Sequence, residues 1–142
     1  MKIMVSACLL GENCKYNGGN NRRQDLLRLL SGHEVIPVCP EVLGGLPTPR
    51  VPAEIVNGAV INREGFPVDD AFRRGAGKAL EMAEKEKPNL IILQSRSPSC
   101  GVKEIYDGTF SGKLIPGHGV FAGMALQAGF HVVDMEDAPE VL

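Results

Sequence analysis

The feature that most constrains the fold is a four-residue apolar run, residues 90–93, that leads directly into a loop rich in hydroxyl groups. Pro88 and Asn89 precede the run, and consecutive Leu and Ile residues in such a setting are typical of a short buried strand. The loop, residues 94–101, carries three serines, one arginine, one glycine and Cys100. Open α/β sheets bind their ligands in loops at the carboxyl ends of strands. We therefore expect the functional site at this loop.

Two more cysteines occupy the same kind of position. Cys8 follows the strand-like run 3–7, and Cys39 follows the run 35–38. The carboxyl ends of parallel strands meet at one edge of a sheet, so three cysteines that are distant in sequence are predicted to converge there.

The remaining pattern sets the fold class. The runs that predict strands are 2–7, 34–38, 90–93 and 130–134, and those that predict helices are 22–30, 68–87 and 120–126. Asn57-Gly58 between two β-branched runs predicts a hairpin over residues 54–61, and residues 102–110 are expected to be extended with a turn at Asp107-Gly108. This order predicts an α/β fold with a mainly parallel, Rossmann-like sheet flanked by helices, in one compact domain spanning residues 1–142. Four prolines and two glycines predict an extended loop without helix over residues 39–54, and residues 135–142 are expected to be an acidic tail.

Composition narrows the function classes. The chain has 142 residues, of which 44% are hydrophobic and 23% charged, and a formal net charge of -2. It therefore offers no electrostatic case for binding nucleic acid or a membrane surface. The amino terminus leads into a strand without the organisation of a signal peptide, which indicates a cytoplasmic protein. In a reducing compartment four cysteines favour metal binding or catalysis over disulfides.

The cysteine spacing favours one kind of metal site. There is no C-x-x-C pair, so a zinc ribbon is disfavoured. Thiolates from three strand ends would suit an iron–sulfur cluster with one iron left open to a substrate. Cys14 could supply a fourth thiolate, and spacing alone leaves that open. A cysteine-nucleophile enzyme that uses Cys100 would lack a base, because no histidine accompanies the motif.

Polar residues near these cysteines are candidates for the chemistry. Glu41 stands two residues after Cys39, where a carboxylate could act as a general base or as a metal ligand. Ser97 and Ser99 flank Pro98 beside Cys100, and either hydroxyl could donate to a ligand. The arginines 50 and 96 could pair with Glu41, Glu54 or an anion.

Several motifs in order resemble the thiouracil desulfurase family, long catalogued as a domain of unknown function. They are Ser6-Ala7-Cys8-Leu9-Leu10-Gly11, Cys14-Lys15-Tyr16-Asn17-Gly18, Cys39-Pro40-Glu41, Gly44-Gly45-Leu46, Pro49-Arg50, Ser97-Pro98-Ser99-Cys100-Gly101 and Ile105-Tyr106-Asp107-Gly108. The resemblance runs from Lys2 to about Gly129. It implies a compact α/β domain that holds a [4Fe-4S] cluster on three cysteines.

The resemblance also implies roles for individual residues. The three cluster ligands fall on Cys8, Cys39 and Cys100, and Cys14 falls on a supporting position. Glu41 and Ser97 fall on the positions that assist the chemistry. We expect the substrate-binding groups to be Asn17, Arg50, Gln94 and Ser99. Two of them depart from the family pattern: Asn17 stands where aspartate is common, and Gln94 where lysine is common.

The implied reaction is a non-redox hydrolysis of a thiolated nucleobase such as 2-thiouracil or 4-thiouracil. The open iron would bind the sulfur, and water activated by Glu41 would add to the carbon. The products would be a C=O group and sulfide on the cluster. The alternative is a cluster- or metal-binding sensor or assembly module without turnover, which would not need a base beside the open position.

Overall fold

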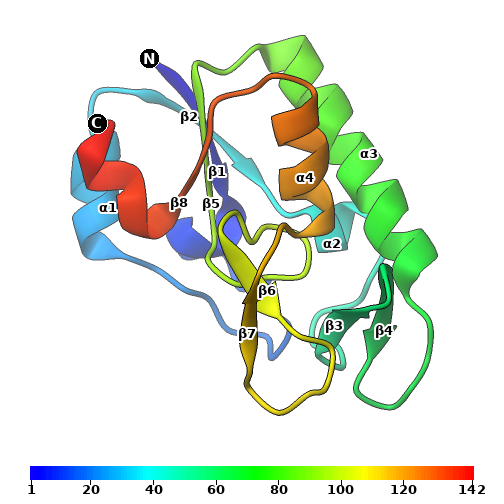
Figure 1. Cartoon of the computed structure of the whole chain (residues 1–142). Coiled ribbons are helices and arrows are strands. Elements are labelled where there is room, and N and C mark those ends of the chain that lie inside the picture. The colour runs from blue at the N-terminus through cyan, green and yellow to red at the C-terminus, as the bar shows by residue number, and fades with distance from the viewer.

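A computed structural model describes residues 1–142 and is built around a four-stranded sheet. The strands are β1 (Lys2–Ser6), β2 (Glu34–Val38), β5 (Leu90–Leu93) and β8 (Val132–Asp134). Their order is β2-β1-β5-β8, and every neighbouring pair is parallel (Figure 1). The predicted parallel α/β architecture is therefore confirmed.

Helices cover both faces of this sheet. The long helix α3 (Asp69–Glu86) and α4 (Val120–Gln127) lie on one face, while α1 (Gln24–Leu30) and the 3₁₀ helix η2 (Met135–Glu140) lie on the other. Alternate residues along a strand pack against the helices on opposite faces of the sheet. Met4 packs with the α3 layer, and its neighbours Ile3 and Val5 pack with the α1 layer. Because both faces are buried, the central strands read as continuous apolar runs.

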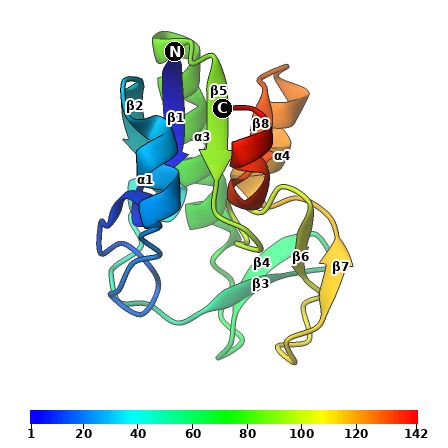
Figure 2. The same cartoon turned by 90° about the vertical axis from the view of Figure 1, so that its left-hand side faces the viewer.

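Two antiparallel hairpins lie beyond the carboxyl ends of the sheet (Figure 2). The first pairs β3 (Ala53–Val56) with β4 (Ala59–Asn62), as predicted, through a turn in which Asn57 and Gly58 have φ angles of 50° and 81°. The second pairs β6 (Glu104–Tyr106) with β7 (Leu114–Pro116). The sequence pattern predicted the extended segment that contains β6, but it did not predict β7.

The expectation that residues 39–54 contain no helix is wrong at one point. Helix α2 (Pro40–Leu43) forms a single turn immediately after Cys39. Pro40 occupies the first helical position, where the missing N–H would have had no intrahelical partner and the fixed φ suits a helix. The prolines exclude helix only in the remainder of the segment, so Glu41 stands on a helical turn.

The acidic carboxyl-terminal segment is also more ordered than predicted. It forms η2, in which Met135 and Ala138 are buried against the α1 layer. Asp134 accepts a hydrogen bond from the backbone N–H of Glu136 and so caps this 3₁₀ helix. The charged residues face outward, and the apolar ones complete the core.

Helices α2 and α3 meet through two glycines. A Cβ atom built on Gly75 of α3 would lie 1.8 Å from the carbonyl oxygen of Pro40. A Cβ atom on Gly44, the residue after α2, would lie 2.1 Å from the carbonyl oxygen of Ala71. Both distances are far shorter than van der Waals contact, so this approach of the backbones requires glycine on both sides.

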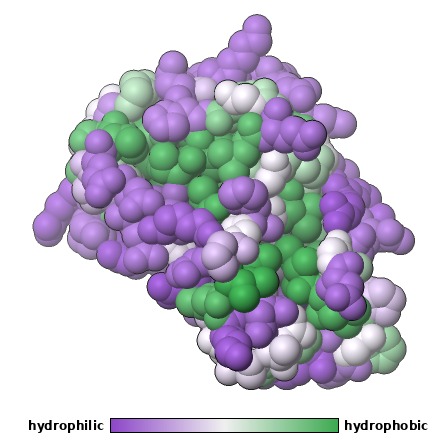
Figure 3. All heavy atoms as spheres, viewed as in Figure 1, coloured by the Kyte–Doolittle hydropathy of each residue, from purple (hydrophilic) through white to green (hydrophobic).

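Polar residues predominate on the face shown in Figure 3, with apolar residues between them. None of the helices combines the length and the apolar character that crossing a membrane requires.

Candidate active site

The site lies where the strand order reverses. From β1 the chain continues to β2 on one side, whereas β5 pairs with β1 on the other side. The loops that leave β1 and β5 therefore diverge, and such a switch point opens a crevice at the carboxyl ends of the strands. Here the crevice is a cavity of about 470 Å³, a size typical of small-molecule sites. Both hairpins contribute to its wall, through residues such as Glu54 and Tyr106.

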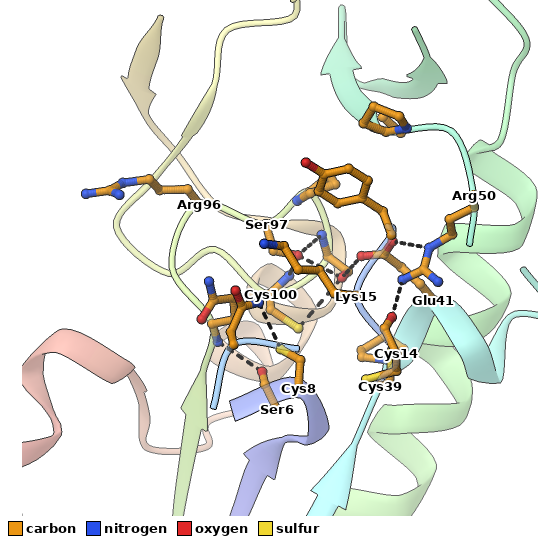
Figure 4. Close-up of a pocket in the computed structure, with 18 of the residues that line it drawn as sticks. Ser6, Cys8, Cys14, Lys15, Cys39, Glu41, Arg50, Arg96, Ser97 and Cys100 are labelled. Carbon is orange, nitrogen blue, oxygen red and sulfur yellow. Dashed lines mark hydrogen bonds and ion pairs between the residues drawn. The ribbon is translucent and has the colours of Figure 1, made fainter. Parts of the chain in front are cut away.

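All four cysteines line this cavity, and none forms a disulfide. Cys8 lies in the 3₁₀ helix η1 (Ala7–Leu10) that follows β1, and Cys39 lies between β2 and α2. Cys100 is buried at the end of the loop that follows β5. The predicted convergence of three strand ends is thus present in the structure (Figure 4). Cys14 reaches the same cavity from the loop after η1 and lies beside Cys39.

The protonation of the four thiols differs. Burial raises the pKa of Cys8, and it raises the pKa of Cys100 to about 12. A hydrogen bond from Cys14, helped by the backbone N–H of Val42 and the charge of Arg50, lowers the pKa of Cys39 to about 7. The same hydrogen bond and burial raise the pKa of Cys14.

The donor set fits an iron–sulfur cluster better than a single ion. No three His, Cys, Asp or Glu side chains converge on one position that a metal ion could occupy. A cluster does not need such convergence, because each cysteine binds a different iron. Thiols at three strand ends around one cavity meet that requirement, and Cys8, Cys39 and Cys100 are the residues so placed.

Glu41 is held in this cavity by Arg50. The arginine Nε donates to Oε1 of Glu41 at 3.0 Å, and both side chains are mostly buried, with exposed fractions of 7% for Arg50 and 15% for Glu41. The terminal nitrogens of Arg50 donate to the carbonyl oxygens of Pro47 and Cys14 and to the hydroxyl of Thr48. Four of the five guanidinium N–H groups thus have protein acceptors. Arg50 therefore fixes both Glu41 and the loop that carries Cys14.

The two serines of the Cys100 loop also connect to Glu41. The Ser99 hydroxyl donates to Oε2 of Glu41 at 2.8 Å, and it lies 3.1 Å from the hydroxyl of Ser97. Ser97 Oγ accepts hydrogen bonds from the backbone N–H groups of Ser99 and Cys100. A continuous chain of hydrogen bonds therefore runs from Ser97 to Arg50.

The four expected substrate-binding residues differ in position. Gln94 lines the cavity, and its side-chain amide makes no hydrogen bond within the protein. Arg50 and Ser99 also line the cavity, although their polar groups already bond to protein. Asn17 is exposed and lies outside the lining, where its side chain accepts from the backbone N–H of Gly19.

Arg96, considered as a partner of Glu41, Glu54 or an anion, instead forms surface ion pairs with Glu104 at 3.3 Å and Glu136 at 3.8 Å. Figure 4 shows its side chain directed away from the cysteines.

Sequence reasoning missed two polar residues that contact the cysteines. The side-chain amide of Asn21 lies 3.5 Å from the sulfur of Cys8. The Ser6 hydroxyl lies close to the thiol of Cys100 and accepts from the backbone N–H of Gln94 at 2.9 Å. Both contacts depend on how the loops fold back, which the local sequence pattern does not specify.

Lys15 and Tyr16 also line the cavity without having been predicted to do so. The ammonium nitrogen of Lys15 lies 5.7 Å from the centre of the Tyr16 ring. The backbone N–H of Arg50 donates to the carbonyl oxygen of Tyr16 at 2.7 Å, so both residues are held over the cavity by the same arginine that holds Glu41.

Comparison with known proteins gives three matches. The family model described as 2-thiouracil desulfurase matches residues 3–137. An uncharacterised protein of Bacillus subtilis (strain 168), YbbK, is 38% identical over 150 residues, with 99% of each chain covered. A solved structure described as the [4Fe-4S]-dependent thiouracil desulfidase TudS aligns with a TM-score of 0.91 at 38% identity, covering 98% of this chain and 93% of that one.

Proposed function

The chain belongs to the 2-thiouracil desulfurase family, and on that premise we propose that it is a [4Fe-4S]-dependent enzyme that desulfurates thiolated nucleobases such as 2-thiouracil or 4-thiouracil. The proposed reaction consumes one water and exchanges C=S for C=O, with hydrogen sulfide as the second product. Neither carbon nor sulfur changes its oxidation state overall, so no external electrons are needed.

Cys8, Cys39 and Cys100 would hold the cluster. The positions of these cysteines support the assignment. Each lies at the end of a strand or of the loop that follows it, lines the cavity, and has a free thiol. When bound, the cluster supplies an iron without a cysteine ligand, which is a Lewis acid for soft sulfur. We assign Cys14 a supporting role, because its side chain lies beside Cys39 in the cavity.

Glu41 would accept the proton from the attacking water. The observation that carries the proposal is the position of this carboxylate, in the same cavity as the three cysteines and fixed through both oxygens. Each carboxylate oxygen has two acceptor sites, so Glu41 can still accept from a water after bonding to Arg50 and Ser99. Gln94, whose amide is free, can donate to a ring carbonyl or accept from a ring N–H. Ser97 is the second residue that we assign to the chemistry, through the hydrogen bonds that join it to Glu41.

The test is sulfide release from 2-thiouracil and 4-thiouracil by cluster-reconstituted protein under anaerobic conditions. Glu41→Gln preserves side-chain size but cannot accept the proton. We expect it to retain iron and to lose about 10²–10⁴-fold in rate, the usual contribution of a general base. Full activity of Glu41→Gln would remove it from the mechanism.

The same assay separates an enzyme from a sensor. A cluster-loaded wild type that releases no sulfide from any thiolated base would favour a cluster-binding sensor or assembly module. Four free thiols and a [4Fe-4S] cluster would suit a reducing compartment, so we place the enzyme in the cytoplasm. A small-molecule substrate is sufficient for this role, and we assign no nucleic-acid partner.

A further inference from the structure

The hydroxyl of Ser99 is the link between Glu41 and Ser97. Ser99 is 1% exposed, and its Oγ lies 2.8 Å from Oε2 of Glu41 and 3.1 Å from Oγ of Ser97. The Ser99 backbone is fixed as well, because its carbonyl oxygen accepts from the N–H groups of Phe121 and Ala122 at the start of α4. A Cβ atom on Gly119 would lie 2.6 Å from the Ser99 carbonyl carbon, so loop and helix are in direct contact.

Donor counting assigns a direction to these hydrogen bonds. Each serine hydroxyl has one proton and two acceptor sites, and a carboxylate can only accept. Ser99 Oγ also lies 3.7 Å from the sulfur of Cys100, but the charged carboxylate at 2.8 Å is the closer and stronger acceptor, so the proton of Ser99 points to Glu41. It follows that the bond between the two serines is donated by Ser97.

The same count leaves Ser97 without free hydrogen-bonding capacity. Its oxygen accepts from the backbone N–H groups of Ser99 at 3.1 Å and Cys100 at 3.0 Å, and its only proton goes to Ser99. All three positions of the hydroxyl are thus occupied within the protein. In this arrangement Ser97 cannot also donate to a substrate or to a water.

We propose that Ser97 is a positioning residue that acts through Ser99, and that Ser99 is the group that orients the Glu41 carboxylate. This inference rests on the proposed function, in which Glu41 accepts a proton. Ser97, Ser99 and Glu41 then form one unit, and loss of any member disturbs the same carboxylate. Hydrogen bonds in such a chain polarise one another, so the effects of removing them are not independent.

The kinetic test uses Ser97→Ala, Ser99→Ala and the double variant in cluster-loaded protein. Loss of a hydrogen bond to a charged group is expected to lower kcat about tenfold or more in each single variant, with KM unchanged. The double variant should be no slower than the slower single variant. Losses that multiply, or a raised KM in Ser97→Ala, would mean that Ser97 contacts the substrate by itself and would overturn the inference.

Two further variants serve as controls. Ser99→Thr keeps the hydroxyl and is expected to recover most of the rate. Ser95→Ala removes a hydroxyl from the same loop, but that hydroxyl donates to Asp134 at 2.6 Å. It is expected to lower thermal stability without altering kcat. A fall in kcat as large as that of Ser99→Ala would indicate a general loosening of the loop and would also overturn the inference.

A spectroscopic readout does not depend on turnover. The infrared difference between cluster-loaded wild type and Glu41→Gln isolates the carboxylate stretching band of Glu41. Ser99→Ala should shift this band, Ser97→Ala should shift it less, and Ser95→Ala should leave it unchanged. If Ser99→Ala shifts the Glu41 band but the wild type has no desulfurase activity, the proposed function is contradicted and this inference is not. Normal activity with an unmoved band in Ser99→Ala would contradict this inference alone. Should Ser99→Ala fail to fold, the band in Ser97→Ala decides.

Discussion

At the scale of single residues, the position of a residue relative to a strand end was a better guide to whether it lies in the site than its residue type was. The thiols of Cys8, Cys39 and Cys100 meet because parallel strands end at one edge, and this could be predicted from three apolar runs. The contact between Cys14 and Cys39 depends instead on a loop that Arg50 holds in place. Its path is set by long-range hydrogen bonds that the local sequence does not encode.

The four cysteines are expected to differ in how much each contributes to iron binding. Serine at position 8, 39 or 100 should sharply lower iron content and visible absorbance after anaerobic reconstitution, because each change removes one of the three proposed cluster ligands. Cys14→Ser keeps a hydroxyl donor beside Cys39 and should retain most of the iron. Iron and acid-labile sulfide analysis of the four variants checks this. Equal loss of iron in Cys14→Ser would contradict a cluster with three cysteine ligands.

Arg50 was expected to bind substrate, whereas its contacts indicate a role in positioning Glu41. Arg50→Ala leaves a largely buried carboxylate without its partner, and we expect the free energy of unfolding to fall by about 3 kcal/mol. Urea denaturation of protein without cluster measures this. The control is Arg73→Ala, which removes a more exposed ion pair with Asp69 and should cost less than about 1 kcal/mol. A residue used only for substrate binding would leave stability unchanged.

At the scale of elements, the strands of the parallel sheet, the first hairpin and the main helices were predictable, but the helix that presents Glu41 was not. Proline and glycine counts over residues 39–54 obscured the single turn of α2, since Pro40 is compatible with the first position of a helix. Strand β7 was missed because three residues between glycine-containing turns give too short a pattern. Short elements of this kind are determined by what they pack against.

The contact between α2 and α3 gives a test with a matched control. Gly75→Ala places a methyl group against the Pro40 carbonyl, so α2 must move, and with it Cys39 and Glu41. We expect lower stability, weaker iron retention and lower activity. Gly77 lies on the same helix with no atom within 4 Å of its Cβ position. Gly77→Ala should therefore raise stability by about 0.5–1 kcal/mol and leave iron retention unchanged. Thermal unfolding with iron analysis compares the two, and equal behaviour would contradict the contact.

At the scale of the whole molecule, the core is nearly independent of the site. One apolar layer lies between the sheet and helices α3 and α4, and the other lies between the sheet and helices α1 and η2. Cys100 is the only cysteine that is buried in either layer. Removal of the cluster is therefore expected to leave secondary structure intact while the cysteine-bearing loops open locally. Circular dichroism and hydrogen exchange of chelator-treated protein test this. A coil spectrum would mean that folding depends on the cluster.

The glycine pair at positions 44 and 75 also bears on how relatives of this protein are interpreted. A homologue that keeps every cysteine and Glu41, yet carries a larger residue at position 75, would satisfy any motif search while its α2 turn could not take this place. Such chains should group with inactive paralogues. The two glycines take no part in the reaction, but they would then distinguish active members of the family from members that have lost activity.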